Sequence, residues 1–139
     1  MKISKAKIDE INALYKIASS TPELRTSARE PPMNREEMAA AIKNRKGVFL
    51  VSRESGRILG FSYASMEGKT YGCLVYDVVI PSSRGKGIGK SLAARSEEWL
   101  KSKGAKSVYG LATNQKMVKI MVHLGYKEGK KLTWLDKRL

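Results

Sequence analysis

The stretch Arg84-Gly85-Lys86-Gly87-Ile88-Gly89 decides the fold of this chain of 139 residues. Its glycines alternate with basic and apolar residues, between a run typical of a strand and a run typical of a helix. Residues 74–80 are rich in β-branched side chains and end at Pro81, which predicts a strand that leads into a turn. From Ile88 onward apolar residues recur at helical spacing, and Gly104 follows the expected last turn. The sequence therefore predicts a glycine-rich junction between a strand and a helix.

Such a junction is suited to bind a phosphate. Glycine lets the backbone approach a ligand closely, and the first N–H groups of a helix have no acceptor inside the helix. The helix dipole adds partial positive charge at the same end. We therefore expect a pyrophosphate to lie over the backbone of residues 85–89.

Two other phosphate-binding motifs do not match this spacing. Gly89-Lys90-Ser91 resembles the end of a P-loop, but that motif needs a glycine five residues before Gly89, where Arg84 stands. A dinucleotide-binding fingerprint needs G-x-G-x-x-G, and Gly89 follows Gly87 one residue too early. The spacing therefore excludes both classes.

The stretch resembles the Q/R-x-x-G-x-G/A signature of the GNAT superfamily, the acetyl-CoA-dependent N-acetyltransferases. Arg84, Gly87 and Gly89 stand in the three defining places. In that family a strand ending in V-x-P precedes the signature, and here Val79-Ile80-Pro81 does so. The resemblance implies an α/β fold (α+β mixed), in which helices flank a mixed, mostly antiparallel sheet and a splayed strand pair holds the cofactor.

The resemblance continues downstream of the signature. The family places an asparagine at the start of a helix that ends in leucine, glycine and an aromatic residue, which is similar to Asn114 followed by Leu124-Gly125-Tyr126. It implies final strands before Leu139 and a single domain over residues 1–139. A loop with Pro31-Pro32 would shape the pocket for the acetyl acceptor.

The resemblance also implies where acetyl-CoA binds. Its pyrophosphate would lie over the N–H groups of the signature, and its pantetheine arm beside the preceding strand, where the N–H of Val79 would polarise the thioester carbonyl. Asn114 would contact the pantetheine or order a water, or it caps its own helix. The expected cofactor-binding residues are Val78, Val79, Ile80, Arg84, Gly85, Lys86, Gly87, Ile88, Gly89, Lys90 and Asn114.

The implied reaction moves acetyl directly to a primary amine, which must first lose a proton. Many members use a carboxylate on the strand before the signature, and Asp77 is the only carboxylate between Glu67 and the signature. Strand alternation places Asp77 on one face with Cys73, Val75 and Val79 until any bulge intervenes. Asp77 is the first candidate for the catalytic base and Glu67 the second, the alternative being a solvent-facing or salt-bridged aspartate.

The position of the general acid departs from the family pattern. Seven residues after Asn114, members often carry a tyrosine that protonates the leaving thiolate, but Met121 stands here. A thioether cannot donate a proton. Because an ordinary thiol has a pKa of about 8.5, coenzyme A can leave as a thiolate with little help. Three possibilities stay open: the enzyme works without an acid, another group such as Tyr76 acts, or the chain binds cofactor without turnover.

Lysine and arginine outnumber aspartate and glutamate by 27 to 13, which gives a formal net charge of +14. This charge solvates the surface, or it attracts the phosphates of coenzyme A, an acidic protein or nucleic acid. Aromatic residues are only weakly interleaved with the basic ones, which does not favour nucleic acid. The first hypothesis is an N-acetyltransferase acting on an amine of a protein or small molecule. The alternative is a non-catalytic module that binds acetyl-CoA or nucleic acid.

Composition sets further limits. No apolar run approaches the ~20 residues that a membrane span needs, and the chain opens with no signal-peptide pattern, so we expect a cytoplasmic protein. The expected oligomeric state is a monomer or a homodimer. Cys73 and His123 are each the only residue of their type, so neither an intramolecular disulfide nor a metal site is expected.

The remaining elements follow from local patterns. Asn34 is suited to cap a helix, with Glu37 as its capping partner. Residues 54–57 predict a hairpin turn. The expected strands are residues 2–7, 48–52 and 58–66, and the expected helices are residues 9–19 and 35–43.

Overall fold

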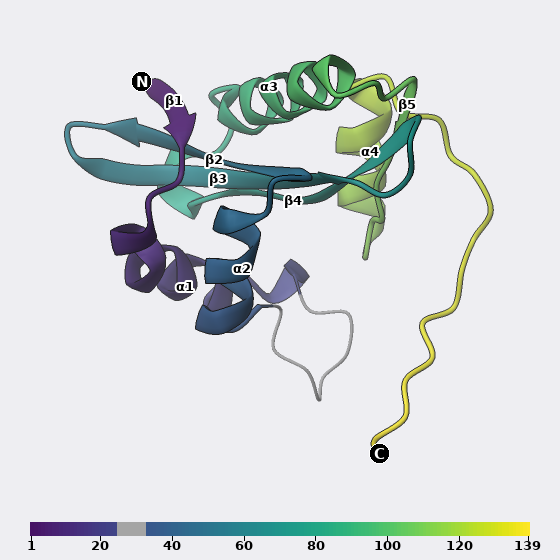
Figure 1. The fold of residues 1–139 in the computed structure, drawn as a ribbon, viewed down its shortest axis with the longest axis horizontal. Coiled ribbons are helices and arrows are strands. Elements are labelled where there is room, and N and C mark those ends of the chain that lie inside the picture. The colour runs from purple at the N-terminus through teal and green to yellow at the C-terminus, as the bar shows by residue number, and fades with distance from the viewer. Residues whose placement is uncertain (25–32) are drawn as a thin grey trace.

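In the computed structural model of the chain, which describes residues 1–24 and 33–139, one five-stranded sheet carries helices on both faces (Figure 1). The loop around Pro31-Pro32 lies outside the described residues. The strands are β1 (Lys2–Lys5), β2 (Gly47–Glu54), β3 (Arg57–Met66), β4 (Tyr71–Val79) and β5 (Ser107–Tyr109). The helices are α1 (Ile11–Ser19), α2 (Arg35–Lys43), α3 (Ile88–Ser102) and α4 (Gln115–His123), with 3-10 turns η1 (Ile8–Glu10), η2 (Pro22–Leu24) and η3 (Pro81–Ser83).

The sheet has the order β1-β2-β3-β4-β5. Strands β1 to β4 pair antiparallel, and β5 pairs parallel to β4. The turn between β2 and β3 uses positive φ angles at Ser55 (51°) and Gly56 (75°), as a tight hairpin requires. The expected mixed, mostly antiparallel sheet is confirmed.

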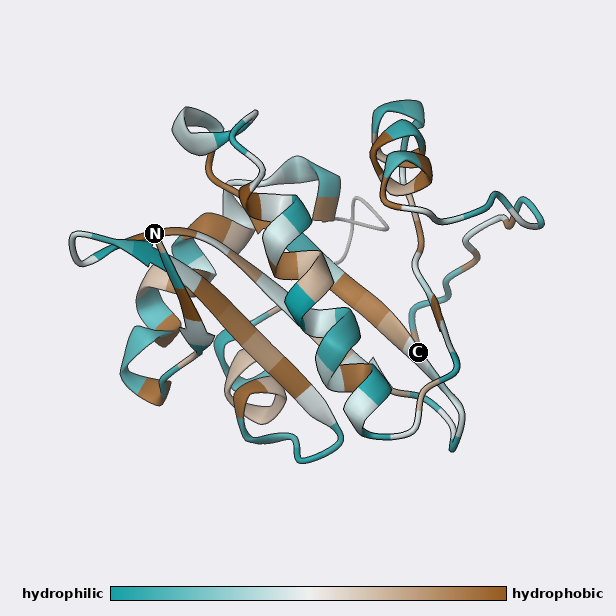
Figure 2. Ribbon diagram, turned by 90° about the horizontal axis from the view of Figure 1, so that it is seen from above, coloured by the Kyte–Doolittle hydropathy of each residue, from teal (hydrophilic) through white to brown (hydrophobic). Residues whose placement is uncertain are grey.

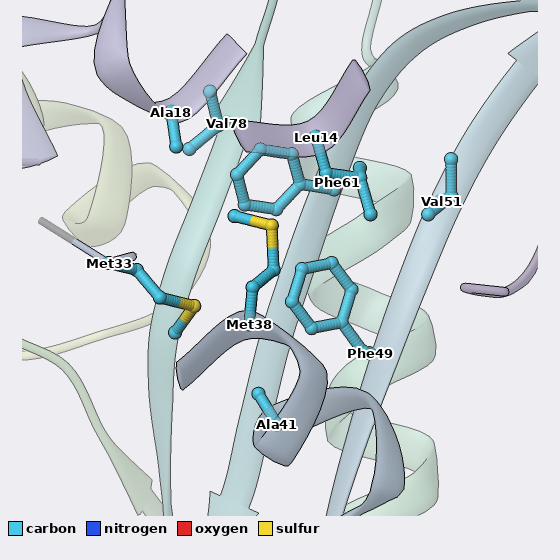
Figure 3. Packing of buried hydrophobic residues seen from close by; sticks show 9 residues of the cluster. All are labelled: Leu14, Ala18, Met33, Met38, Ala41, Phe49, Val51, Phe61 and Val78. Carbon is cyan, nitrogen blue, oxygen red and sulfur yellow. The ribbon is translucent and has the colours of Figure 1, made fainter. Parts of the chain in front are cut away.

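Helices α1 and α2 cover one face of the sheet. Their buried residues Leu14 and Met38 pack against Phe49 and Phe61, whose rings stack with centroids 5.4 Å apart (Figure 3). Asn34 caps α2, because its side chain accepts a hydrogen bond of 2.8 Å from the N–H of Glu37. The helix start predicted at Asn34 is confirmed.

Helix α3 covers the opposite face, where it lies across the apolar stretches of the strands (Figure 2). Its residues Leu92 and Leu100 are buried against the sheet, and its Ser96 shares a buried hydrogen bond of 2.9 Å with Ser62 of β3. At Gly72 of β4, an added Cβ would lie 2.7 Å from a methyl group of Leu100. The absence of a side chain at Gly72 therefore lets the end of α3 approach the sheet.

The end of the chain differs from the expectation. No strand follows α4, and residues 124–139 form neither helix nor strand, so the predicted final strands are wrong for this structure. The exposed fractions of Leu132 (75%) and Leu135 (87%) show that this segment buries little apolar surface. A strand needs a partner edge, and β5, with three residues, offers few pairing positions.

No helix in the described part of the chain has the length and apolar character that crossing a bilayer requires.

Candidate active site

The outer edge of β4 is open where the strand approaches the glycine-rich stretch. Pairing with β5 ends at Cys73 and Tyr109, while β4 continues to Val79. Among the described residues, no strand pairs with this edge beyond Cys73. The predicted splay between β4 and β5 is therefore present, and it leaves backbone groups free to bind an extended ligand.

Hydrogen bonding shows which groups point to the open edge. The N–H of Ile80 donates to the carbonyl of Leu59 in β3 at 2.9 Å. Because neighbouring residues of a strand point their N–H groups to opposite edges, the N–H of Val79 points away from β3. The carbonyl of Val79 accepts a hydrogen bond of 2.9 Å from Nε of Arg84. The Val79 N–H is thus placed on the open edge, as an oxyanion donor would need to be.

Directly beyond this edge, the glycine-rich stretch forms a backbone cradle. Gly85 and Gly87 adopt φ angles of 79° and 81°, which L side chains rarely tolerate, and an added Cβ would meet no atom within 4 Å at either residue. The N–H groups from Gly85 to Lys90 have no backbone acceptor within the described residues, and the first bond of α3 is from the Ser91 N–H to the carbonyl of Gly87 at 3.0 Å. Open space, unused donors and the helix dipole together fit a pyrophosphate.

A bulge in β4 changes the direction of the residues that lead to the cradle. Tyr63 of β3 pairs with Tyr76 and Ala64 pairs with Leu74, so Val75 has no partner in β3. One extra residue reverses the alternation of side chains between the two faces of the sheet. The faces of β4 before and after Val75 must therefore be assigned separately.

After the bulge, Asp77 faces α3. Val78 belongs to the core under α1 and α2, whereas Val79 and Leu74 pack on the α3 side. By alternation, Asp77 shares the α3 side with Val79 and Leu74, and Cys73 lies on the other face. The bulge therefore separates Asp77 from Cys73, while the shared face of Asp77 and Val79 is retained.

The carboxyl of Asp77 lies beneath the start of α3. A Cβ added at Gly89 would lie 3.7 Å from both carboxyl oxygens. Oδ1 is buried and accepts no hydrogen bond from any described residue. Burial raises the pKa of Asp77 well above its ordinary value, and the nearby carboxylate of Glu97 raises it further. The structure therefore places a buried carboxyl of raised proton affinity next to the cradle.

Glu97 lies near the candidate site, and the sequence pattern did not single it out. Gly89, Ala93 and Glu97 are each four residues apart on α3, so they share one face of the helix. This spacing was the signal in the sequence that could have pointed to Glu97. The hydroxyl of Tyr126 donates to its Oε1 at 2.9 Å. Burial raises the pKa of Tyr126, and so does this hydrogen bond to Glu97. Tyr126 therefore has a polar contact in addition to its packing.

Glu67 lies at the other end of β4. Its Oε1 accepts a hydrogen bond of 3.0 Å from Ser65, just before the strand begins. Nine residues of strand at about 3.3 Å each separate it from the cradle by roughly 30 Å. The structure brings Asp77 to the cradle and leaves Glu67 far from it.

Met121 lies where β4 and β5 diverge. A Cβ added at Gly110 would overlap Cε of Met121 and would lie 3.6 Å from the carbonyl oxygen of Leu74. Asn114 caps α4, because its Oδ1 accepts a hydrogen bond of 2.9 Å from the N–H of Met117. The capping role of Asn114 is thus present.

Tyr76, the other residue considered as an acid, faces the core under α1 and α2. Burial raises its pKa, and so do the charges of Glu37 and Tyr63. A raised pKa makes a phenol a weaker acid, so this environment does not favour Tyr76 as a proton donor.

A cavity of about 1160 Å³ opens between β5, α4 and the segment that follows α4. Glu97, Met121 and Tyr126 line it. The cavity therefore gives Glu97 access to solvent from the side of α4. Within residues 1–24 and 33–139, no group of three or more His, Cys, Asp or Glu side chains could hold a metal ion.

Solved structures share the fold at low sequence identity. A mutant of the BH1408 protein from Bacillus halodurans matches with a TM-score of 0.82 and 16% identity, over 99% of this chain and 100% of that one. An acetyltransferase from Trypanosoma brucei matches with a TM-score of 0.77 and 22% identity, over 98% and 99%. The aminoglycoside N-acetyltransferase AAC(6')-Iy in complex with CoA matches with a TM-score of 0.75 and 18% identity, over 99% and 100%.

No curated protein matches the chain by sequence. The sequence model described as the acetyltransferase (GNAT) family matches residues 11–126, which include the open edge of β4, the cradle and α4. The resemblance seen in the signature thus extends over most of the sequence, and the chain belongs to the GNAT family of acetyl-CoA-dependent N-acetyltransferases.

Proposed function

We propose that this N-acetyltransferase moves acetyl to a primary amine of a protein or small molecule by direct attack of the amine on the thioester of acetyl-CoA. One observation carries the proposal: an unpaired strand edge leads directly into a helix N-terminus whose N–H groups have no backbone acceptor among the described residues. The edge is suited to hold the pantetheine arm, and the helix N-terminus is suited to hold the pyrophosphate.

The roles of the binding residues follow from their places. The N–H groups of the cradle would bind the pyrophosphate, with Lys86 and Lys90 adding positive charge beside it. Asn114 would contact the pantetheine arm or order a water while it caps α4. The proposed cofactor-binding residues remain Val78, Val79, Ile80, Arg84, Gly85, Lys86, Gly87, Ile88, Gly89, Lys90 and Asn114.

In the proposed reaction, the amine nitrogen forms a bond to the thioester carbon, and the carbonyl oxygen becomes an oxyanion beside the N–H of Val79. The carbon–sulfur bond then breaks, and coenzyme A leaves as a thiolate. The reaction therefore needs no proton donor at the position of Met121. Asp77, directly or through water, accepts the proton that the amine loses. Its burial supports this role, because a raised pKa brings a carboxylate closer to the proton affinity that a base needs near neutral pH.

Three broader points belong to the proposal. The cores on the two faces of one sheet support a single domain over residues 1–139. We propose that the enzyme acts in the cytoplasm, where acetyl-CoA is supplied, as a monomer or homodimer. The charge of +14 mildly disfavours a polycationic acceptor.

The experiment is a screen of amine acceptors with acetyl-CoA, in which release of the coenzyme A thiol is followed. Peptides with free N-termini or lysines and small amines form the library. We expect turnover with at least one acceptor, and Asp77→Asn should lower its rate by about 10²-fold with little change in acetyl-CoA affinity. Binding of acetyl-CoA with no turnover across the library would instead support the non-catalytic module. If Asp77→Asn keeps a rate within a few fold of the parent, Asp77 is not the base.

A further inference from the structure

Asp77 and Glu97 are two carboxyls along one face of α3, and neither has a cationic partner in a strongly basic protein. The chain contains 27 lysine and arginine residues, yet none of those in the described part forms an ion pair with Asp77 or Glu97. The described ion pairs involve Glu10 and Glu54 instead. A pair of carboxyls kept apart from neutralising cations next to a binding site is typical of a tuned proton site.

The fold also arranges the pair around α3. Asp77 reaches the first turn of the helix from β4, and Glu97 lies two turns further along the same helix face. The partial positive charge at the start of α3 would by itself favour the ionised form of Asp77 and weaken it as a base. The negative charge of Glu97 acts in the opposite direction.

Tyr126 fixes Glu97 in this position. Its hydroxyl donates to Oε1 of Glu97 at 2.9 Å, and its own N–H donates to the carbonyl of Met121 at 3.0 Å. Glu97 is a long, flexible side chain that lines a cavity, so without this bond it can turn into solvent, where its effect on Asp77 would be screened.

We propose that Glu97, held by the hydroxyl of Tyr126, is a positioning residue that makes the buried carboxyl of Asp77 a stronger proton acceptor. Other titratable groups near the cluster are Cys73 on β4 and Tyr126 itself. Ser62, paired with Asp77 across the sheet, and Ser96 on α3 carry no charge. This inference rests on the proposed role of Asp77 as the base, and it predicts which residue sets the pH at which that base becomes active.

The first test measures Asp77 itself in the protein without cofactor. The ¹³C signal of its carboxyl is followed by NMR against pH in the parent, in Glu97→Gln and in Tyr126→Phe. We expect the titration midpoint of Asp77 to fall in Glu97→Gln, and to fall less in Tyr126→Phe. Glu98→Gln is the matched control, because Glu98 is the exposed neighbour on the same helix, and it should leave the midpoint unchanged.

The second test uses the pH profile of acetyl transfer. The acid limb of kcat/KM should move to lower pH in Glu97→Gln by the same amount as the NMR midpoint, and Glu97→Asp should restore part of the shift. An unchanged Asp77 midpoint in a folded Glu97→Gln protein would overturn the inference. If the midpoint falls but Asp77→Asn retains full activity, the coupling stands and the proposed base fails, so the two failures are distinguishable.

Discussion

Gly87 and Gly89 stand two residues apart in the signature, but the structure requires glycine only at Gly87. Gly87 caps α3 in a left-handed conformation with φ of 81°. Gly89 is the second residue of α3, and an added Cβ there would make ordinary contacts, 3.5 Å from Val79 and 3.7 Å from Asp77. The cradle should therefore tolerate a methyl group at Gly89 and fail with a side chain at Gly87.

This difference predicts opposite outcomes for two variants. Gly87→Val should abolish the rise in Tm that acetyl-CoA causes, because its side chain fills the open space above the cradle, and backbone strain should lower the free energy of unfolding by about 1–3 kcal/mol. Gly89→Ala should keep the rise in Tm and stabilise the apo protein by roughly 0.5–1 kcal/mol, since alanine is the better helix residue. Thermal unfolding with and without acetyl-CoA measures both. A folded Gly87→Val protein with an undiminished shift would remove the cradle assignment.

At the scale of elements, features that depend on neighbouring residues were predicted well. Features that depend on how distant segments pack together were not. The cap of α2 at Asn34 and the hairpin turn at Gly56 depend on residues a few positions apart, and both are confirmed. The bulge at Val75 depends on how β3 and β4 align, which the sequence of β4 alone does not encode. The bulge is the exception that the sequence analysis allowed, and it places Asp77 and Cys73 on opposite faces of the sheet.

The same distinction applies to the candidate site. The strand, the signature and the start of α3 are contiguous in the chain, so the cradle could be predicted. The contact of Glu97 with Tyr126 joins residues 29 positions apart and appears only when α3 and the segment after α4 are packed together. The strands expected after residue 126 came from the resemblance, and the structure does not contain them.

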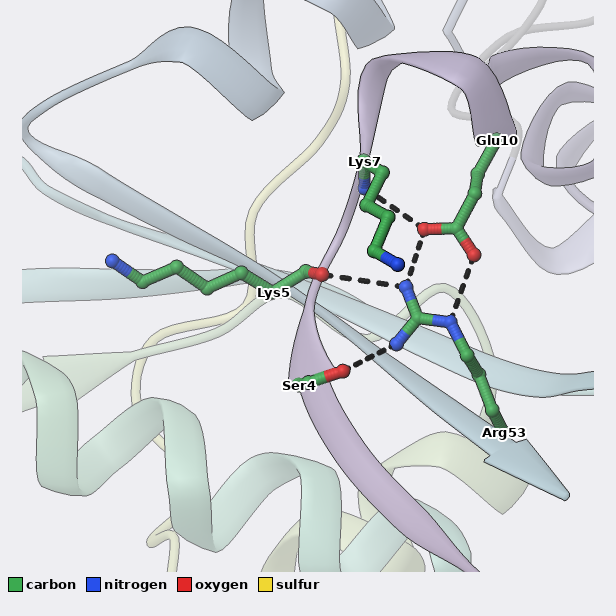
Figure 4. Close-up of polar contacts among 5 residues, drawn as sticks. All are labelled: Ser4, Lys5, Lys7, Glu10 and Arg53. Carbon is green, nitrogen blue, oxygen red and sulfur yellow. Dashed lines mark hydrogen bonds and ion pairs between the residues drawn. The ribbon is translucent and has the colours of Figure 1, made fainter.

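The prediction at this scale concerns how β1 and β2 hold the start of α1. Arg53 of β2 donates from Nε to Oε2 of Glu10 at 2.8 Å, pairs with Oε1 of the same carboxylate, and also contacts Ser4 and the carbonyl of Lys5 (Figure 4). Although burial raises the pKa of Glu10, the hydrogen bonds from Arg53 and from the N–H of Lys7 outweigh it and hold that pKa below its ordinary value.

Arg53→Met should therefore lower the free energy of unfolding by roughly 1–2 kcal/mol at pH 7. Because the folded pKa of Glu10 lies below its unfolded value of about 4.3, the contribution is complete above that pH and is lost as pH falls through the folded pKa. Denaturant unfolding from pH 7 to pH 3 should show the parent and the variant converging at the acid end. Glu10→Gln serves as the partner in a double-mutant cycle, and a loss that is independent of pH would show that packing, not charge, accounts for the effect.

At the scale of the whole molecule, three layers carry the fold, and a basic segment extends beyond them. The layers are α1 with α2, the sheet, and α3. The segment after α4 leaves the layers, as Figure 1 shows. With Lys130, Lys131, Lys137 and Arg138 it carries part of the net charge of +14, and it adds no strand to the sheet.

This distribution predicts how the protein meets nucleic acid. Basic residues occur along the whole sequence, and aromatic residues are only weakly interleaved with them, unlike in single-strand binders. We therefore expect binding to duplex DNA and to RNA that is weak, indifferent to sequence and governed by counterion release. Mobility-shift titrations at ~150 mM salt should show only weak complexes that disappear steeply as salt rises. A version lacking residues 130–139 should bind more weakly still, since it loses three lysines and one arginine that can attract phosphate. Nanomolar binding that selects one sequence and persists at high salt would instead make nucleic acid a specific partner of this enzyme.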